Sequence, residues 1–216
     1  MMRLNIERHP GGTDMNGELA AVGERLRAQD DVPYLVPGGG SNTVGALGYA
    51  HVAVETMTQT NEMGLKIDLF VHATGLMGTS AGLVVGFEAL NSGIHVRDIG
   101  VHNPRDRQEP AVHALADKAA KEKLDLPGIR RDEVQANCEY VSGGYGIPTD
   151  GMVEALGMPA RLEGIFLGPV YSGKGMAGLI ELVCKKTWTA DQNIVFLHAG
   201  GQVGLSIYRN ALSPAA

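Results

Sequence analysis

A glycine-rich loop between a predicted strand and a predicted helix is the first candidate for chemistry. Its residues are Ala73, Thr74, Gly75, Leu76, Met77, Gly78 and Thr79. Such a loop presents free backbone N–H groups at the start of a helix, and the helix dipole adds partial positive charge, so it favours a bound phosphate. The alternative is a tight turn in which glycine relieves crowding between strand and helix. The pattern by itself leaves both interpretations open.

Two nucleotide-binding classes are disfavoured by the glycine loops. The loop at 73–79 lacks the lysine of a GxxxxGK[ST] triphosphate loop, and its spacing differs from GxGxxG. A second loop, Pro37–Asn42, follows another predicted strand. No acidic residue ends a strand about 20 residues further on, where the ribose of a dinucleotide would need one. We therefore expect neither a triphosphatase nor a dinucleotide-binding domain.

Two tyrosines flanked by glycines are the next candidates. Tyr145 lies in the segment 143–146, and Tyr171 lies in the segment 169–175. A phenol in such a loop stacks on a planar ligand or donates its proton. For either tyrosine taken singly, a ring packed at a sheet edge with its hydroxyl in solvent is the favoured interpretation. His198, at a strand end, is a ligand, a base or, more commonly, a hydrogen-bonded structural residue.

Signatures of metal sites and of activated nucleophiles are missing from the sequence. The seven histidines show no ligand spacing such as HExxH, so we expect no metal site. No GxSxG elbow occurs, and neither Cys138 nor Cys184 lies in a recognisable nucleophile context.

Composition narrows the class of protein further. The 216 residues carry a formal net charge of −6 without a basic stripe, which disfavours nucleic acid as a partner. No apolar run approaches the ~20 residues of a membrane span, and no signal peptide is recognisable, so we expect no membrane association. Two cysteines without a CxxC pair favour a reducing cytoplasm.

The elements that must position these residues alternate between β-rich runs and helix-length segments. The predicted strands are Arg3–Arg8, Pro33–Val36, Ile67–Ala73, Ile94–Val101, an extended Val134–Val141, Ile165–Leu167 and Asn193–His198. The predicted helices are Thr13–Ala28, Ser41–Asn61, Thr79–Leu90, Arg105–Glu122, Thr149–Glu163 with a late break at Gly157 or Pro159, and Gly173–Lys186. This order predicts an α/β fold with a mostly parallel sheet and flanking helices. Ligands of such sheets bind beyond the carboxyl ends of the strands, where three of the glycine clusters lie.

Seven ordered segments together resemble one family. They are His9–Met15 (HPGGTDM), Pro37–Tyr49 (PGGGSNTVGALGY), Ala73–Leu83 (ATGLMGTSAGL), Gly143–Pro148 (GGYGIP), Gly151–Leu156 (GMVEAL), Pro169–Leu179 (PVYSGKGMAGL) and Val195–Gly201 (VFLHAGG). The set resembles the pyridoxal-phosphate enzymes that include D-cysteine desulfhydrase and aminocyclopropane-carboxylate deaminase. The segments PGGTDM and PVYSGKGMAGL are most similar to the corresponding segments of L-cysteate sulfo-lyase.

The resemblance implies a truncated tryptophan-synthase-β-like fold (fold type II), with pyridoxal 5'-phosphate as cofactor. Residues 1–40 would be a remnant of the small N-terminal domain, and residues 41–216 the large cofactor-binding domain. The loop Thr74–Thr79 would hold the phosphate, in agreement with its physical interpretation. Tyr145 and Tyr171 would be the catalytic phenols facing substrate and cofactor, and Ser172 would lie near the pyridine ring.

Departures from the family pattern are as informative as the matches. Leu76 and Met77 stand where the family has small or hydroxyl residues, so we expect their bulk to narrow the phosphate site. Ala199 stands where the family has a threonine that bonds the pyridine nitrogen. The family's Schiff-base lysine lies in an Asn-Lys-x-Arg-Lys motif that this sequence lacks, and we expect the segment that carries it to be absent. Lys174 is no substitute, because the family already has a lysine there.

Two functions remain open from the sequence. The first is a pyridoxal-phosphate-dependent lyase that performs α,β-elimination on L-cysteate or D-cysteine, releasing pyruvate, ammonia and sulfite or sulfide. The second is a non-catalytic module, a truncated chain or pseudoenzyme that binds a phosphorylated ligand or a partner chain. Without the lysine, which delivers the cofactor and moves the α-proton, we expect the isolated chain to be inactive. A small domain cut short would expose apolar surface, so we also expect a homo-oligomer.

Overall fold

The computed structural model describes residues 4–212. The chain divides into two compact units, Met1–Gly40 and Ser41–Ala216. The assignment of residues 1–40 to a small-domain remnant and of 41–216 to a cofactor-binding domain stays a prediction.

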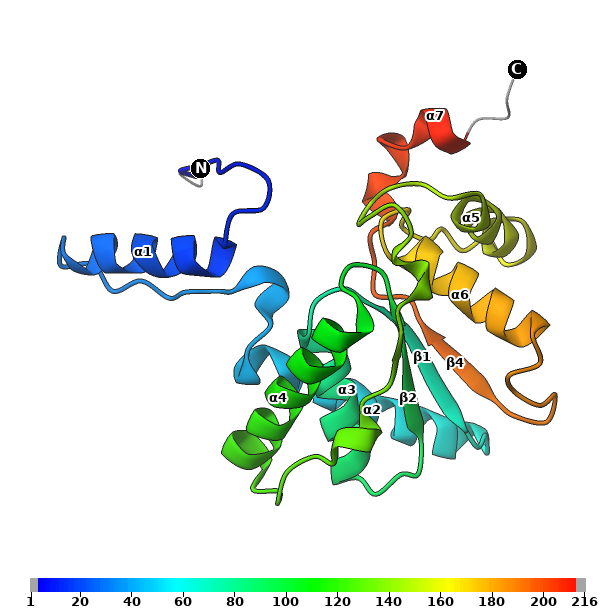
Figure 1. Cartoon of the computed structure of the whole chain (residues 1–216). Coiled ribbons are helices and arrows are strands. Elements are labelled where there is room, and N and C mark those ends of the chain that lie inside the picture. The colour runs from blue at the N-terminus through cyan, green and yellow to red at the C-terminus, as the bar shows by residue number, and fades with distance from the viewer. Residues whose placement is uncertain (1–3, 213–216) are drawn as a thin grey trace. The chain divides into compact units, whose positions relative to one another are not determined.

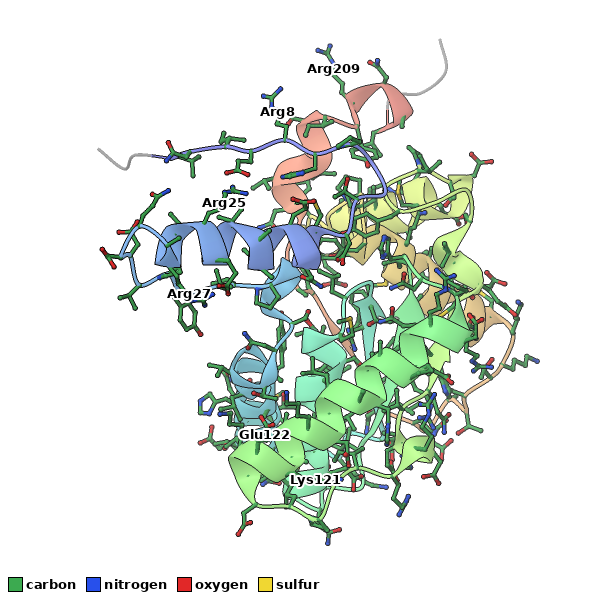
Figure 2. The ribbon with its side chains drawn as sticks, turned by 60° about the vertical axis from the view of Figure 1, so that its left-hand side comes forward. Arg8, Arg25, Arg27, Lys121, Glu122 and Arg209 are labelled. Atoms are coloured by element: carbon green, nitrogen blue, oxygen red, sulfur yellow. The ribbon has the colours of Figure 1, made fainter. Side chains whose placement is uncertain are left out.

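The first unit is built on one helix, α1 (Met15–Arg27). The helix begins after Asp14, whose Oδ1 accepts from the N–H groups of Asn16 and Gly17 at 3.1 Å each and so caps the first turn. Arg25 extends from α1 towards the segment that precedes it (Figure 2), and its Nη2 donates to Glu7 Oε1 at 2.6 Å. The helix predicted from Thr13 to Ala28 is confirmed.

The strands predicted at Arg3–Arg8 and Pro33–Val36 are wrong. Arg3 lies outside the described residues, and neither 4–8 nor 33–36 forms a strand. A strand needs the N–H and C=O groups of a neighbour, and within this unit neither segment has one. The apolar pattern of 33–36 therefore yields an extended segment whose Tyr34 side chain is exposed.

The second unit contains one parallel sheet in the described part of the chain. Its strands are β1 (Leu69–Thr74), β2 (His95–Gly100), β3 (Ala136–Asn137) and β4 (Ile194–Leu197), in the spatial order β3-β2-β1-β4. Every neighbouring pair runs parallel, and β1 pairs with β2 from Leu69↔His95 to Thr74↔Gly100. The predicted α/β fold with a parallel sheet is confirmed.

Helices cover both faces of this sheet, as Figure 1 shows. On one face lie α2 (Thr43–Met63), α3 (Gly78–Ala89) and α4 (Arg105–Leu124); on the other lie α5 (Asp150–Leu162) and α6 (Ser172–Cys184); α7 (Arg209–Leu212) follows near the end. Phe70 and Val96 enter the core beneath α2, α3 and α4, whereas Ala73 and Ile99 face α6. No helix within residues 4–212 is long and apolar enough to span a membrane.

Three predictions for the second unit need correction. Only Ala136–Asn137 of the extended segment Val134–Val141 is a strand, and 3₁₀ turns lie on either side. Ile165–Leu167 is not a strand; the carbonyl oxygen of Phe166 lies 3.0 Å from His198 Nε2 instead of in a ladder. Helix α5 runs through Pro159 without a break. Pro159 cannot donate one i→i−4 hydrogen bond, yet the helix continues for three more residues to Leu162.

Helices α2 and α3 approach each other unusually closely at two glycines. A Cβ added to Gly82 would lie 2.2 Å from the carbonyl oxygen of Ala46, and one added to Gly86 would lie 2.6 Å from that of Ala50. Residues 80–87 of α3 are all buried. The backbone of α2 therefore contacts α3 directly, and α3 lies between α2 and the sheet.

We predict opposite effects for two glycine-to-alanine changes in this helix pair. Gly82→Ala is expected to lower the free energy of unfolding by about 1–3 kcal/mol, because the clash with backbone outweighs the gain in helix propensity. Gly48→Ala, in α2 with nothing within 4 Å of the new methyl, is expected to raise it by about 0.5–1 kcal/mol. Denaturant unfolding of both variants measures the difference. Equal stability of the two would contradict the close approach.

Candidate functional site

The turn between β1 and α3 presents a row of free N–H groups at the carboxyl edge of the sheet. The first i→i−4 bond of α3 runs from Ala81 N to Met77 O at 2.9 Å, so the preceding N–H groups lie outside the helical ladder. Among residues 75–80, only Gly78 N has an acceptor in the described structure, the hydroxyl of Ser41 at 3.2 Å. Met77 supplies no side-chain cap. We call the turn at residues 75–80 the cradle; its free amides and the helix dipole suit an anion.

A hydrogen-bonded network fixes the strand side of the cradle. Gln108 on α4 is fully buried, and its Nε2 donates to Thr74 Oγ1 at 3.0 Å. Thr74 Oγ1 donates to the carbonyl oxygen of Leu76 at 3.2 Å. Asn103 Nδ2 donates to Gln108 Oε1 at 3.0 Å and to the carbonyl oxygen of Gly75 at 3.3 Å. Sequence reasoning missed Gln108 and Asn103, because nothing in a helix-period pattern links position 108 to a turn 34 residues earlier.

Tyr145 lies against Gly75, at the start of the cradle. A Cβ added to Gly75 would lie 3.5 Å from Tyr145 Cε2, and the phenol ring meets the ring of His102 edge-on at 5.0 Å between centroids. Its hydroxyl has no hydrogen-bond partner among residues 4–212. Burial raises the pKa of Tyr145 above its ordinary value, and the nearby phenols of Tyr171 and Tyr208 raise it further. Tyr145 is therefore a neutral phenol with its proton free to donate.

Tyr171 and Ser172 are tied to the segment that follows β4. Tyr171 Oη donates to the carbonyl oxygen of Ala199 at 3.3 Å, and the ring lies against Gly201, where an added Cβ would be 3.0 Å from Cζ. Ser172 is buried and its Oγ donates to the carbonyl oxygen of Gly200 at 2.7 Å. The structure thus brings Tyr171, Ser172 and Ala199 together, with the hydroxyls of the first two already engaged in hydrogen bonds. A contact of any of them with cofactor stays a prediction.

Lys174 supports the loop that carries Tyr145. Its side chain is 1% exposed, and its Nζ donates to the carbonyl oxygens of Val141 and Gly144 at 3.0 and 2.8 Å. Burial lowers the pKa of Lys174. On the other side of Tyr145, the carbonyl oxygen of Gly146 accepts from Tyr208 Oη at 2.5 Å. The loop is therefore fixed on both sides of its phenol, and the amine of Lys174 serves as a structural donor.

A cleft lies at the opposite edge of the sheet from the cradle. This cleft, of about 660 Å³, is formed where β1 and β2 begin and includes Lys66, Asp68 and His95. Its polar groups satisfy one another: Lys66 Nζ lies 3.0 Å from Asp68 Oδ1, and Asp68 Oδ2 accepts from Asn193 N. In parallel sheets ligands bind at the carboxyl edge, so the cradle is the stronger candidate. Within residues 4–212 no three His, Cys, Asp or Glu side chains gather as a metal site would need.

The comparisons with known proteins agree with this geometry. A family model described as pyridoxal-phosphate dependent enzyme matches residues 2–200. The chain belongs to this family of pyridoxal-phosphate-dependent enzymes. A solved structure of an ACC deaminase homologue is 30% identical, with a TM-score of 0.84 over 96% of this chain and 61% of that one. The fold is therefore fold type II of these enzymes, as predicted, and the chain spans about 61% of the length of this relative.

More distant members of the family share the fold alone. A crystal structure of O-ureido-L-serine synthase is 16% identical with a TM-score of 0.60, covering 96% of this chain and 62% of that one. A hydrogen sulfide-producing enzyme from Fusobacterium nucleatum is 19% identical with a TM-score of 0.52, covering 88% and 59%. Neither carries information about the substrate of this chain.

The residues of the cradle fit the phosphate of the family's cofactor. Five of the six N–H groups at 75–80 have no acceptor in the part of the chain that the structure describes, and the Leu76 side chain is partly exposed at the turn. The Met77 side chain packs against the hydrophobic core that includes Phe70 and Leu83. The expectation that the bulk of Leu76 and Met77 narrows the phosphate site stays a prediction. Whether Ala199 changes the environment of the pyridine nitrogen stays a prediction.

We predict that the two cysteines react at very different rates. Cys138 lies against Gly100 at the end of β2, and burial, together with the charges of Asp98 and Glu109, raises its pKa to about 11. At pH 8.5 only about 0.3% of such a thiol is thiolate, the reactive form. Iodoacetamide should therefore label the exposed Cys184 at least about tenfold faster than Cys138. Peptide mass spectrometry measures both rates, and the difference should vanish in denaturant; equal rates in the folded protein would contradict the burial.

Proposed function

We propose that this chain forms the phosphate-binding half of a pyridoxal-phosphate site for a lyase of small sulfur amino acids. The proposed reaction is α,β-elimination from L-cysteate or D-cysteine, giving pyruvate, ammonia and sulfite or sulfide. The observation that carries the proposal is the row of N–H groups at residues 75–80, five of which have no acceptor within residues 4–212, with the ring of Tyr145 against Gly75 at its start. Family membership supports the cofactor, and the PGGTDM and PVYSGKGMAGL segments support the substrate class.

Each part of the site has a distinct task in this proposal. The free amides of the cradle hold the phosphate dianion. When bound, the cofactor supplies an electron sink for bond cleavage at the substrate α-carbon. Tyr145 Oη, which holds its proton and has no internal acceptor, donates that proton to the departing sulfur group or to a substrate oxygen. Tyr171 Oη already donates to the carbonyl oxygen of Ala199. In this proposal the Tyr171 ring therefore lines the site, and its hydroxyl does not donate to the substrate.

The position of the lysines favours a second candidate function, a non-catalytic ligand-binding module. The seven lysines of the sequence include one buried side chain, Lys174, whose amine donates to two carbonyl oxygens. The other lysines lie on helix surfaces or at the opposite sheet edge. A covalent link to the cofactor would therefore have to come from a lysine outside the 216 residues, and the chain alone would bind the cofactor without a bond to it.

We predict phosphate-selective, non-covalent binding by the isolated chain. Pyridoxal 5'-phosphate should bind at least about tenfold more tightly than pyridoxal, because several charge-assisted amide contacts depend on the phosphate. Equilibrium fluorescence titration measures both dissociation constants. Borohydride treatment followed by peptide mapping should leave Lys174 unlabelled, and pyruvate should not form from L-cysteate or D-cysteine.

The outcomes separate the two functions. A labelled lysine together with pyruvate release would establish an intact lyase site within this chain. Binding without label or pyruvate would support the module, or a site completed by a further segment that carries the lysine. Equal affinity for pyridoxal and its phosphate would overturn the proposal. A homo-oligomer also stays a prediction, which light scattering tests.

We predict that the Tyr145 phenol ionises above the ordinary phenol pKa of about 10. Desolvation disfavours the tyrosinate, and a phosphate dianion in the cradle should raise the pKa further, since like charges repel. The difference in absorbance at 295 nm between the wild-type chain and Tyr145→Phe isolates this group during a pH titration, with circular dichroism to confirm that the fold persists. A midpoint at or below the ordinary value, or a decrease when inorganic phosphate is added, would contradict the placement of the ring.

A further inference from the structure

Three polar side chains are fully buried between α3 and the sheet. His72 on β1 and Asp98 on β2 occupy paired register positions, and Ser80 lies in the first turn of α3. Each side chain is 2% exposed or less. Ser80 Oγ donates to Asp98 Oδ2 at 2.5 Å, and His72 Nε2 lies 2.8 Å from Asp98 Oδ1. The reaction proposed above uses none of the three.

The contacts of His72 show where the protons of this group lie. Its Nδ1 is 2.9 Å from the carbonyl oxygen of Ala73, so Nδ1 carries a hydrogen, because a carbonyl oxygen only accepts. Within residues 4–212 neither Nε2 nor Asp98 Oδ1 has another hydrogen-bond partner, although the alignment of the two atoms is poor for a hydrogen bond. Two lone pairs at 2.8 Å would repel, so one of these two atoms carries a proton. Whichever atom holds it, the pair has no net charge, which suits its burial.

Folding alone does not explain polar groups at these positions. Phe70 and Val96, two residues earlier on the same face of β1 and β2, are apolar members of the core. Well-packed apolar residues stabilise such a site as well as a buried ion pair does, or better. The group also cannot act on a substrate, since all three side chains are shielded from solvent and the carboxylate separates the imidazole from the hydroxyl.

Ser80 connects this buried group to the cradle. Its backbone N–H is one of the free amides at residues 75–80, while its side chain reaches down to Asp98 on the sheet. Asp98 in turn contacts His72, which lies two residues before Thr74 at the end of β1. Thr74 is the last residue of β1 and directly precedes the cradle. The contacts therefore form a closed path that joins the first turn of α3 to the strand from which the cradle starts.

We propose, resting on the cofactor function above, that Ser80, Asp98 and His72 are positioning residues for the phosphate. The bond from Ser80 to Asp98 resists lifting and rotation of the first turn of α3, and His72 holds the carboxylate in the orientation that Ser80 needs. The free N–H groups thereby converge on one anion without reorganisation on binding. Loss of the hydroxyl leaves the helix in place but loosens the turn, so the contacts to phosphate weaken while those to the pyridine ring do not.

The decisive measurement compares the affinities of the full chain for pyridoxal 5'-phosphate and for pyridoxal. Ser80→Ala is expected to bind the phosphate form about three- to tenfold more weakly, as expected for one lost hydrogen bond that fixes the site. Its affinity for pyridoxal is expected to be unchanged. The ratio of the two dissociation constants is a readout that does not depend on enzyme activity and that a general loss of stability does not move.

Two substitutions of Asp98 separate hydrogen bonding from charge. In Asp98→Asn the amide oxygen still accepts from Ser80, and the amide nitrogen donates to Nε2 of a neutral His72 whose Nδ1 keeps its hydrogen. This variant is expected to keep the wild-type ratio. Asp98→Leu removes both contacts and is expected to behave like Ser80→Ala. If Asp98→Leu does not fold, the comparison of Ser80→Ala with Asp98→Asn still tests the positioning role.

Thr60→Val supplies the matched control. Thr60 is buried in the same unit, and its hydroxyl donates to the carbonyl oxygen of Thr56 at 2.9 Å. At a rise of about 1.5 Å per residue, Thr60 lies about 25 Å along α2 from the N-terminus of that helix. The Thr60→Val variant should be less stable than the wild-type chain, but the ratio of its dissociation constants for pyridoxal 5'-phosphate and pyridoxal should be unchanged. A ratio that moves equally in Ser80→Ala and Thr60→Val, or an Asp98→Asn that loses phosphate selectivity, would overturn the positioning role. A wild-type chain without phosphate selectivity would instead overturn the function on which the role rests.

Discussion

The close packing of α3 between α2 and the sheet is the constraint on which the site depends. Gly82 and Gly86 let the backbone of α2 approach α3 to a distance that any side chain would prevent. Because α3 follows β1 after a turn of only three residues, a helix fixed in this way has its first turn fixed at the carboxyl edge of the sheet. The free N–H groups of that turn are therefore held at a defined place before any anion arrives.

Two polar networks complete this fixation from opposite sides. Gln108 and Asn103 hold the strand side of the cradle through Thr74 and Gly75. Ser80 holds the helix side through Asp98. The bonds from Gln108 to Thr74 and from Ser80 to Asp98 are buried, so they face little competition from water and leaving one unmade is costly. Preorganisation of this kind lets an anion bind without a cost for ordering the turn.

The phenols and the lysine of the site have roles that their sequence motifs do not distinguish. Tyr145 and Tyr171 both lie in glycine-containing segments, yet the hydroxyl of Tyr145 has no partner within residues 4–212, whereas that of Tyr171 donates to the carbonyl oxygen of Ala199. Lys174 lies in a segment that resembles a catalytic-site motif, but its amine binds two carbonyl oxygens and stabilises the Tyr145 loop. Under the proposed function, the cradle would bind the phosphate, Tyr145 would be the proton donor, and the covalent link to the cofactor would come from a lysine outside these 216 residues.

The sequence by itself determined the alternation of strands and helices, the parallel α/β class and the glycine turn that opens α3, because these depend on local stereochemistry and on the period of apolar residues. It wrongly predicted strands at 4–8, 33–36 and 165–167, because a strand forms only beside a partner strand, and the apolar period of a segment does not identify that partner. Tertiary structure alone decided the order β3-β2-β1-β4 and the register that sets His72 opposite Asp98. It alone brought Gln108 to Thr74 and Lys174 to Gly144. These contacts join residues about 20 to 35 positions apart, and their geometry follows from how helices pack on the sheet, which no local pattern encodes.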